Sequence, residues 1–153
     1  MIVINQPVPD FEFESTDQTI QRLSDLKGRP LILYFYPKDH TSGCTLQAEI
    51  FRDDFSKYQK LNAIILGVSR DSVRSHFSFI EKLNLPFALI SDKDASLCQL
   101  FNVIKPKTMY GKPVKGIERS TFLIDQQGVL RKEWRGVKVD GHSQQVLDAL
   151  ASL

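Results

Sequence analysis

Hydrophobic positions along this chain form short continuous runs that alternate with spaced repeats. The continuous runs at residues 31–36, 62–70 and 87–92 are rich in strand-forming residues on both faces, as expected of central strands covered on both sides. Between them, residues 42–58 and 71–83 carry apolar side chains at helical spacing, which predicts two amphipathic helices. Strands that alternate with helices in this way need crossover connections and favour some parallel pairing.

The two predicted helices each have an apolar face that should pack on the sheet. We expect Asp71 to cap the N-terminus of the second helix, because a short side-chain oxygen can accept from the free N–H groups there. The positions expected to face the core are Leu46, Ile50, Phe51 and Phe55 in the first helix and Val73, Phe77 and Ile80 in the second.

Shorter elements are predicted toward the two ends of the chain. Residues 10–15 alternate phenylalanine with acidic residues, which indicates an edge strand, and residues 93–103 suit a short helix. Residues 104–118 hold two prolines and two glycines, so we predict a loop. Residues 119–134 suit a β-hairpin, and a last helix should begin near Asp140.

Together these elements predict an α/β sandwich with a mixed central sheet. Their order is β-β-β-α-β-α-β-α-β-β-α, in which the closing hairpin adds antiparallel strands to a partly parallel centre. A chain of 153 residues can bury a core of its own without metal or disulfide cross-links. Because no repeat, linker or low-complexity segment interrupts it, we predict one domain over residues 1–153.

Composition narrows the classes of partner. The 20 basic and 18 acidic side chains are interspersed and give a net charge of +2, so neither nucleic acid nor an anionic membrane is expected as the main partner. The longest apolar run, residues 31–36, is too short to span a bilayer. The N-terminus lacks a basic start followed by an apolar stretch, so we expect no export signal and a cytoplasmic protein with reduced thiols.

One of the two cysteines, Cys44, lies in a context that favours reactivity. It falls in the first turn of a helix that follows a buried strand, where unpaired N–H groups and the helix dipole stabilise a thiolate, the nucleophilic form of cysteine. Gly43 permits close approach to the sulfur, Thr41 offers a hydroxyl, and Pro37 can shield the site from water. The alternative is that Cys44 is a buried filler with chance neighbours, but position and neighbours together favour a reactive cysteine.

The segment YFYPKDHTSGCT resembles the active-site signature of the peroxiredoxins. Its Pro37, Thr41 and Cys44 have the family spacing Pro-x-x-x-Thr-x-x-Cys, and the segment is most similar to the Q-type branch, the bacterioferritin comigratory proteins. The similarity continues through FRDDF, GVSRDSVRSHFSFIEKLNLPFALISD and GIERSTFLIDQQG, and so covers nearly the whole chain. The resemblance implies a thioredoxin-like fold, which is a three-layer sandwich, and the activity of a thiol peroxidase.

By position, the resemblance implies a catalytic role for four residues. Cys44 is the peroxidatic cysteine, whose thiolate attacks a peroxide oxygen and becomes a sulfenic acid. Thr41 hydrogen-bonds the sulfur and the peroxide, and Pro37 shields them. Arg119 matches the active-site arginine, and a guanidinium is suited to follow negative charge as it moves from sulfur to the leaving oxygen. Without the family match, Arg119 would suit a solvated residue at a strand entrance.

The chain departs from the family at the resolving cysteine. Many Q-type members carry it five residues after the peroxidatic one, where this chain has Glu49, and others carry it in the next helix, which has no cysteine here. Cys98 remains, and its neighbours Leu97 and Phe101 suit a buried helical residue. We therefore expect a one-cysteine cycle in which glutathione, thioredoxin or glutaredoxin reduces the sulfenic acid. The alternative is a Cys44–Cys98 disulfide that forms after local unfolding.

The other polar residues near the motif are expected to be surface groups. His40, His76 and His142 fall in three different elements, so we expect surface histidines, and neither a metal nor another cofactor. His40 as a general base is a weaker alternative, because the helix dipole and Arg119 already favour the thiolate. Asp39 is expected to be a loop charge.

The leading hypothesis is a monomeric thiol peroxidase for hydrogen peroxide and organic hydroperoxides. A different class is a thioredoxin-fold binding or holdase protein that has kept the scaffold without enzymatic activity. A third is a thiol–disulfide carrier, which would need a Cys-x-x-Cys pair that this sequence lacks. The four matched residues together argue against a decayed site.

Overall fold

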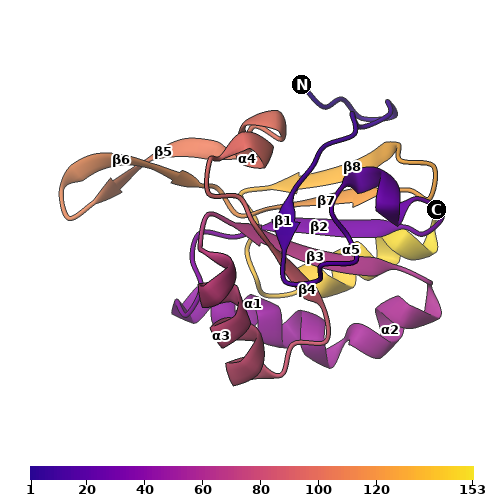
Figure 1. Cartoon of the computed structure of the whole chain (residues 1–153), viewed down its shortest axis with the longest axis horizontal. Helices are drawn as coiled ribbons and strands as arrows, with labels where there is room; N and C mark the ends of the chain where they lie inside the picture. The colour runs from indigo at the N-terminus through magenta and orange to yellow at the C-terminus, as the bar shows by residue number, and fades with distance from the viewer.

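A mixed six-stranded sheet forms the centre of the molecule (Figure 1). The structure, a computed structural model, describes the backbone of residues 1–153 and every side chain except that of Met109. The sheet strands, in spatial order, are β1 (Glu14–Ser15), β4 (Ala88–Ser91), β3 (Ile64–Ser69), β2 (Leu31–Phe35), β7 (Ser120–Ile124) and β8 (Leu130–Arg135). The predicted α/β class with a mixed sheet is confirmed.

Strand β2 is the junction between the parallel and the antiparallel part of the sheet. It runs parallel to β3 and antiparallel to β7, so that Tyr34 lies between Gly67 and Thr121. Strands β3 and β4 are also parallel, whereas β1 and β8 add antiparallel edges. The C-terminal end of β2 and the N-terminal end of β7 therefore meet at the same edge of the sheet.

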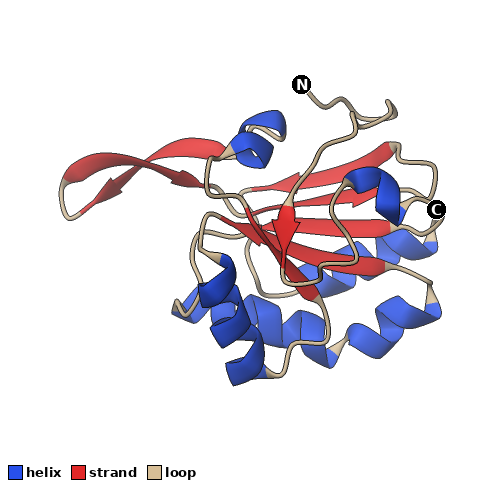
Figure 2. Ribbon diagram, in the orientation of Figure 1, coloured by secondary structure: helices blue, strands red, loops and turns tan.

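Helices cover both faces of the sheet. The face with the larger helices carries α1 (Ser42–Asp53), α2 (Phe55–Lys60), α3 (Val73–Leu83) and α5 (His142–Ala151), and the other face carries the 3-10 helix η1 (Leu23–Leu26), α4 (Ser96–Leu100) and the N-terminal segment. Figure 2 shows α1, α2 and α3 gathered on one side of the sheet. Within the described part of the chain, none of these helices has the length and apolar character needed to cross a membrane.

Two hydrophobic cores lie on opposite faces of the sheet. The side chains of β2 and of Tyr36, which follows it, point alternately to opposite sides, so Leu33 and Phe35 face one core while Tyr34 and Tyr36 face the other. All four side chains are at most 1% exposed, which explains the continuous apolar run in the sequence. The sheet therefore separates the side chains of α1 from those of α4.

The predicted helix over residues 42–58 is divided in two at Asp54. The backbone there leaves the helical conformation, with φ −91° and ψ 2°, and the Asp54 carboxylate accepts a hydrogen bond from Ser143 Oγ of α5 at 2.7 Å. Of the expected inward residues, Phe51 is buried but Leu46 is 50% exposed. The buried positions of α1 are Cys44, Gln47, Ala48 and Phe51.

Helix α3 differs from its prediction in both its cap and its buried face. Its N-cap is Ser72, whose Oγ accepts from the Ser75 backbone N–H at 3.1 Å, whereas the Asp71 carboxylate accepts from the backbone N–H of Asp39. Phe77 is 50% exposed rather than inward-facing. The buried positions are His76, Phe79 and Leu83. A histidine can take a core position here because both of its ring nitrogens find hydrogen-bond partners.

The predicted loop over residues 104–118 is wrong, because this segment forms a β-hairpin. Strands β5 (Ile104–Met109) and β6 (Lys112–Ile117) pair antiparallel, joined by a two-residue turn in which Tyr110 and Gly111 have φ of 53° and 76°. Positive φ at both turn residues is the hairpin geometry that matches strand twist. Prolines fit into these strands because each strand of a two-stranded ribbon has one unpaired edge.

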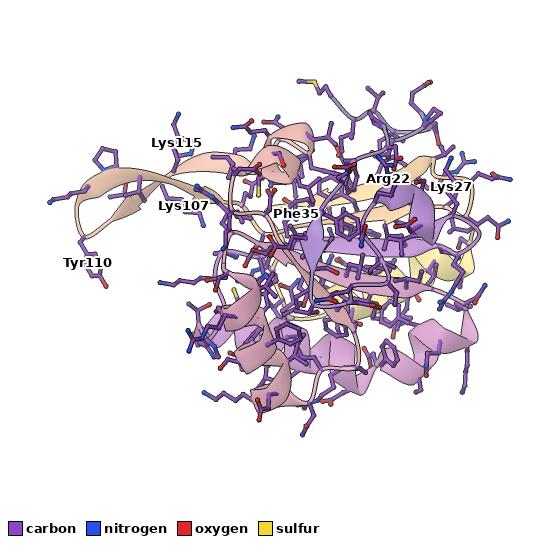
Figure 3. All side chains as sticks on the ribbon, in the orientation of Figure 1. Arg22, Lys27, Phe35, Lys107, Tyr110 and Lys115 are labelled. Carbon is purple, nitrogen blue, oxygen red and sulfur yellow. The ribbon has the colours of Figure 1, made fainter. Side chains whose placement is uncertain are left out.

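This hairpin projects from the body of the molecule (Figure 1). Figure 3 shows Lys107, Tyr110 and Lys115 on it, away from Phe35 in the sheet. Residues 104–117 carry four lysines and no acidic residue, so the hairpin is a basic extension of the sheet edge where β7 begins.

Candidate active site

Cys44 lies where β2 leads into helix α1. It is the third residue of α1, its side chain is 2% exposed, and it packs in the same core as Tyr34 and Ala48. The first turn of a helix has N–H groups without helical partners, and the helix dipole makes this end positive. Cys44 therefore lies at the positive end of α1.

Arg119 reaches Cys44 because β2 pairs with β7. Phe35, the last residue of β2, pairs with Ser120, the first residue of β7, so the residue before β7 lies beside the loop that leads into α1. The Nη2 atom of Arg119 donates to Cys44 Sγ at 3.4 Å. A Cβ atom at Gly43 would lie 3.2 Å from the same Nη2, so the glycine leaves room for the guanidinium. The structure thus brings together two of the residues expected in the site.

Gln47 is a member of the site that the sequence analysis missed. It lies one turn after Cys44, is 2% exposed, and its Oε1 accepts from Arg119 Nη1 at 2.6 Å. The guanidinium is therefore held by two groups on the same face of α1, the amide and the sulfur. The Gln47 Nε2 has no hydrogen-bond partner among the described residues. A polar residue three positions after a buried cysteine was the available signal, because such residues share a helix face.

Thr41 and Pro37 bracket the turn before Cys44. Thr41 is the N-cap of α1, and its Oγ1 donates to the Lys38 carbonyl at 2.7 Å. Here the hydroxyl proton goes to the main chain rather than to the sulfur, which leaves the oxygen free to accept from a protonated group. Pro37 is half-buried and follows β2, where it has no N–H to donate.

Comparison with known proteins places this architecture in one family. The family model described as AhpC/TSA family matches residues 4–133. The chain belongs to the AhpC/TSA family. Within it, peroxiredoxin Bcp of Bacillus subtilis is 48% identical over 152 residues, which cover 99% of this chain and 97% of the relative. The putative peroxiredoxin bcp of Coxiella burnetii is 48% identical over 149 residues, which cover 97% of this chain and 99% of the relative.

Solved peroxiredoxin structures have the same fold. A cysteine-to-serine mutant of Xylella fastidiosa PrxQ superposes with a TM-score of 0.92 at 43% identity, covering 99% of this chain and 97% of that chain. The predicted thioredoxin-like fold and the predicted Q-type branch are confirmed. This peroxiredoxin is a thiol-dependent peroxidase, as predicted, which removes the hypothesis of a non-enzymatic scaffold.

Asp39, in the turn before α1, and His76, in α3, are both buried in this peroxiredoxin, so the prediction of a surface histidine is wrong for His76, and Asp39 is a loop charge that is not exposed. Asp39 is 3% exposed and His76 is fully buried, with His76 Nδ1 2.7 Å from Asp39 Oδ2. Burial alone would raise the pKa of Asp39, but hydrogen bonds from His76 and Tyr36 outweigh it and lower the pKa. Only His40 is exposed as predicted. No pattern in the sequence marks this pair, because its members come from different elements.

His142 is also buried, which corrects the same prediction at a second position. It is 2% exposed at the start of α5, and its Nε2 lies 2.7 Å from Thr121 Oγ1 of β7. Burial lowers the pKa of His142, and the nearby Arg119 guanidinium lowers it further. A neutral ring is therefore expected there at neutral pH.

Cys98 lies on the other face of the sheet from Cys44. Helix α4 holds it in the core that contains Phe35 and Phe101, whereas Cys44 lies in the core under α1. Both cysteines are free thiols. Burial, together with the neighbouring Asp92 carboxylate, raises the pKa of the Cys98 thiol far above its usual range. The structure does not bring Cys98 to the site, and the thiol there is held in its unreactive form.

Proposed function

We propose that the Cys44 thiolate reduces hydroperoxides by direct attack on the peroxide. An electron pair of the sulfur forms an S–O bond while the O–O bond breaks, and the second oxygen leaves as water or an alcohol after it takes up a proton. The sulfur is oxidised to a sulfenic acid and the peroxide is reduced. The contact of 3.4 Å between Arg119 Nη2 and Cys44 Sγ carries this proposal, because it puts a fixed cation beside the reacting atoms.

The residues around the sulfur have separate roles in this step. During the attack, negative charge moves from the sulfur to the leaving oxygen. Arg119 Nη2 can stabilise this charge on both atoms, because Gln47 holds the other end of the guanidinium in place through Nη1. The Thr41 oxygen accepts a hydrogen bond from the peroxide O–H, because the Thr41 hydroxyl donates its own hydrogen to the Lys38 carbonyl. Pro37 excludes water without adding a competing donor. These assignments rest on the geometry and on the family spacing.

The proposed substrates are hydrogen peroxide and organic hydroperoxides. A solved structure of the Xanthomonas campestris bacterioferritin comigratory protein, 46% identical to this chain, is described in connection with alkyl peroxide reduction activity. The same class of substrate suits this chain because the attack needs only an accessible O–O bond, whatever group the second oxygen carries.

The proposed cycle uses one cysteine. Position 49 is a glutamate and helix α3 has no cysteine, so neither usual position of a resolving cysteine is filled. Because Cys98 lies on the other side of the sheet, we propose that an external thiol reduces the sulfenic acid. Thioredoxin, glutaredoxin or glutathione would attack the sulfenic acid and release water. The competing route is a Cys44–Cys98 disulfide, which would require the sheet or α4 to open because the two sulfurs lie in different cores. We propose that the chain acts as a single domain and a monomer in the cytoplasm.

Mass analysis under non-reducing conditions tests the proposal. One equivalent of peroxide should add one oxygen to the protein, and Cys98→Ser, the control, should behave in the same way because that thiol takes no part. Loss of two hydrogens in place of the added oxygen would replace the one-cysteine cycle with the disulfide route. Peroxide consumption that survives Cys44→Ser would contradict the catalytic assignment itself.

A further inference from the structure

His76 lies between two hydrogen-bond acceptors, which fixes its proton content. Its Nε2 is 2.8 Å from the Ile90 carbonyl oxygen and its Nδ1 is 2.7 Å from Asp39 Oδ2. A carbonyl oxygen can only accept, so Nε2 carries a proton. The other ring nitrogen faces a carboxylate, so the pair as a whole holds one proton more than a neutral imidazole beside an ionised acid.

The surroundings of Asp39 indicate where that additional proton lies. Asp39 Oδ1 accepts from the Tyr36 hydroxyl at 2.6 Å, and Oδ2 accepts from Ser75 Oγ at 2.8 Å as well as from the ring. Several donors directed at one carboxyl group stabilise its ionised form. The proton therefore belongs to the ring, and His76 and Asp39 form an imidazolium–carboxylate pair with His76 fully buried.

This pair holds the centre of the turn that carries the site. Asp39 stands midway between Pro37 and Thr41, and its backbone N–H also donates to Asp71 Oδ2 at 2.9 Å, so both its main chain and its side chain are fixed to the start of α3. The next residue, His40, has φ 65°, a left-handed conformation that costs a non-glycine residue free energy. A strained turn persists only where its surroundings fix it, and here the fixed neighbour is Asp39.

We propose that His76 is a positioning residue for the peroxidase reaction, acting through Asp39 to hold in place the turn from Pro37 to Thr41, which leads into helix α1. The inference rests on the proposed function of Cys44. His76 does not touch the reacting atoms. It ties α3 and β4 to the turn, and so fixes the backbone that leads to Thr41, the N-cap of α1.

A metal site at the same residues is a less suitable interpretation. Ligand atoms of Asp39, Asp71 and His76 lie within 4.8 Å of one another, a grouping that could surround a cation. However, both His76 nitrogens already face acceptors, and Asp71 Oδ2 accepts from Ser69 Oγ and from the Asp39 N–H. The ligand atoms of this group are therefore already used in hydrogen bonds with one another and with their neighbours, as in a hydrogen-bonded cluster.

Two replacements of His76 separate its two contacts. In His76→Gln the amide nitrogen can take the place of Nε2 and keep the bond to Ile90 O, but the contact with Asp39 is lost. In His76→Asn the amide nitrogen can take the place of Nδ1 and keep the contact with Asp39. The matched control is Ser78→Gln, which puts the same side chain at an exposed position of α3.

The readout is the second-order rate of Cys44 oxidation by hydrogen peroxide, measured where circular dichroism shows each variant folded. His76→Gln should react about 10- to 100-fold more slowly, the cost of a misplaced reacting group. His76→Asn should recover most of that rate although it also loses a buried contact. An unchanged rate in His76→Gln, or equal slowing in both variants, would overturn the proposal, since a merely structural residue would not distinguish them.

Nitrogen NMR of the folded protein tests the proton content directly. Both His76 ring nitrogens should carry a proton, because each faces an acceptor, and in Asp39→Asn the proton on Nδ1 should be lost together with its anionic partner. A neutral His76 ring in the wild-type protein, or metal bound stoichiometrically at this cluster, would overturn the pair. Either result would overturn the role of His76 and leave the proposed function of Cys44 standing. Failure of the proposed function would instead appear as peroxide consumption by the Cys44→Ser variant.

Discussion

At the scale of single residues, the site depends on how one guanidinium is shared. Arg119 donates to Cys44 Sγ with one nitrogen and to Gln47 Oε1 with another. This arrangement needs a planar fork of donors, which arginine has and lysine lacks. A substitution that keeps the positive charge but removes the paired donors can therefore show whether the charge alone is sufficient.

We predict that Arg119→Lys lowers the second-order rate of Cys44 oxidation about 100-fold, although the positive charge is kept. A lysine cannot bind the amide and the sulfur together, so the donor no longer follows the leaving oxygen. Stopped-flow measurement of the rate gives the test, with the exposed Arg74→Lys as control. If Arg119→Lys reacts at the wild-type rate, charge alone is sufficient and the fork geometry has no role.

The members of the candidate site could be found from the sequence to different extents, for a physical reason. Cys44 could be found because strand, turn and helix patterns meet at it, and Arg119 could be found only through the family resemblance, since sheet pairing brings it in from far along the chain. Gln47 was missed, and the burial of Asp39 and His76 was not predicted, because polar residues are usually exposed and a single sequence does not show which of them have buried partners.

At the scale of elements, helix α3 has its N-cap at Ser72, one residue after the position predicted from the sequence. Ser72 accepts from the Ser75 N–H, while Asp71 is used by Ser69 and Asp39. Both residues are good capping types, so their order alone could not decide between them. Ser72 is the cap because the Asp71 carboxylate accepts hydrogen bonds from Asp39 and Ser69 instead of from the first turn of α3.

We predict that Ser72→Ala lowers the free energy of unfolding by about 1 kcal/mol, because one N–H group of the first turn of α3 loses its acceptor. Urea denaturation followed by circular dichroism measures the change. Ser78→Ala, at an exposed position of the same helix, should leave stability unchanged or slightly higher, since alanine favours helix. Equal effects at the two positions would mean that the cap has no special contribution.

The β5–β6 hairpin shows the limit of composition as a guide to elements. Its prolines and glycines are typical of loops, yet Pro106 and Pro113 lie within paired strands and Gly111 lies in the turn. A ribbon that projects from the molecule has free edges where a missing N–H costs nothing. Local composition cannot reveal this, because the tolerance comes from the absence of a neighbouring strand on that side.

At the scale of the whole molecule, the sheet separates the two cysteines into different cores. Cys44 lies in the core under α1 and α3, and Cys98 lies in the core under α4 and the N-terminal segment. The burial pattern that identifies β2 as a central strand also implies two cores, so the layers were predictable from sequence. The core to which each cysteine belongs was not, because it depends on the path of the crossovers.

Global stability should depend on pH through carboxylates that the fold stabilises in their ionised form. Asp125, in the turn between β7 and β8, accepts from the backbone N–H groups of Gln127 and Val129 and from Arg131 Nε at 2.7 Å. Burial opposes ionisation, but these hydrogen bonds outweigh it and lower the pKa of Asp125. Because the folded pKa lies below the unfolded value of about 3.9, the contribution is complete above that pH and is lost as pH falls through the folded pKa.

We predict that Asp125→Asn lowers the free energy of unfolding by about 1 kcal/mol at pH 7, a modest value because the Arg131 side chain is 41% exposed and its charge is screened. The asparagine oxygen still accepts from the two N–H groups, so the difference reports the lost charge together with the lost hydrogen bond from Arg131 Nε. Urea denaturation at stepwise lower pH should show the difference from wild type shrinking below about pH 4, while the exposed Asp140→Asn shows none at any pH. A gap that stays constant into acid would mean that the effect of the substitution comes from shape rather than from charge.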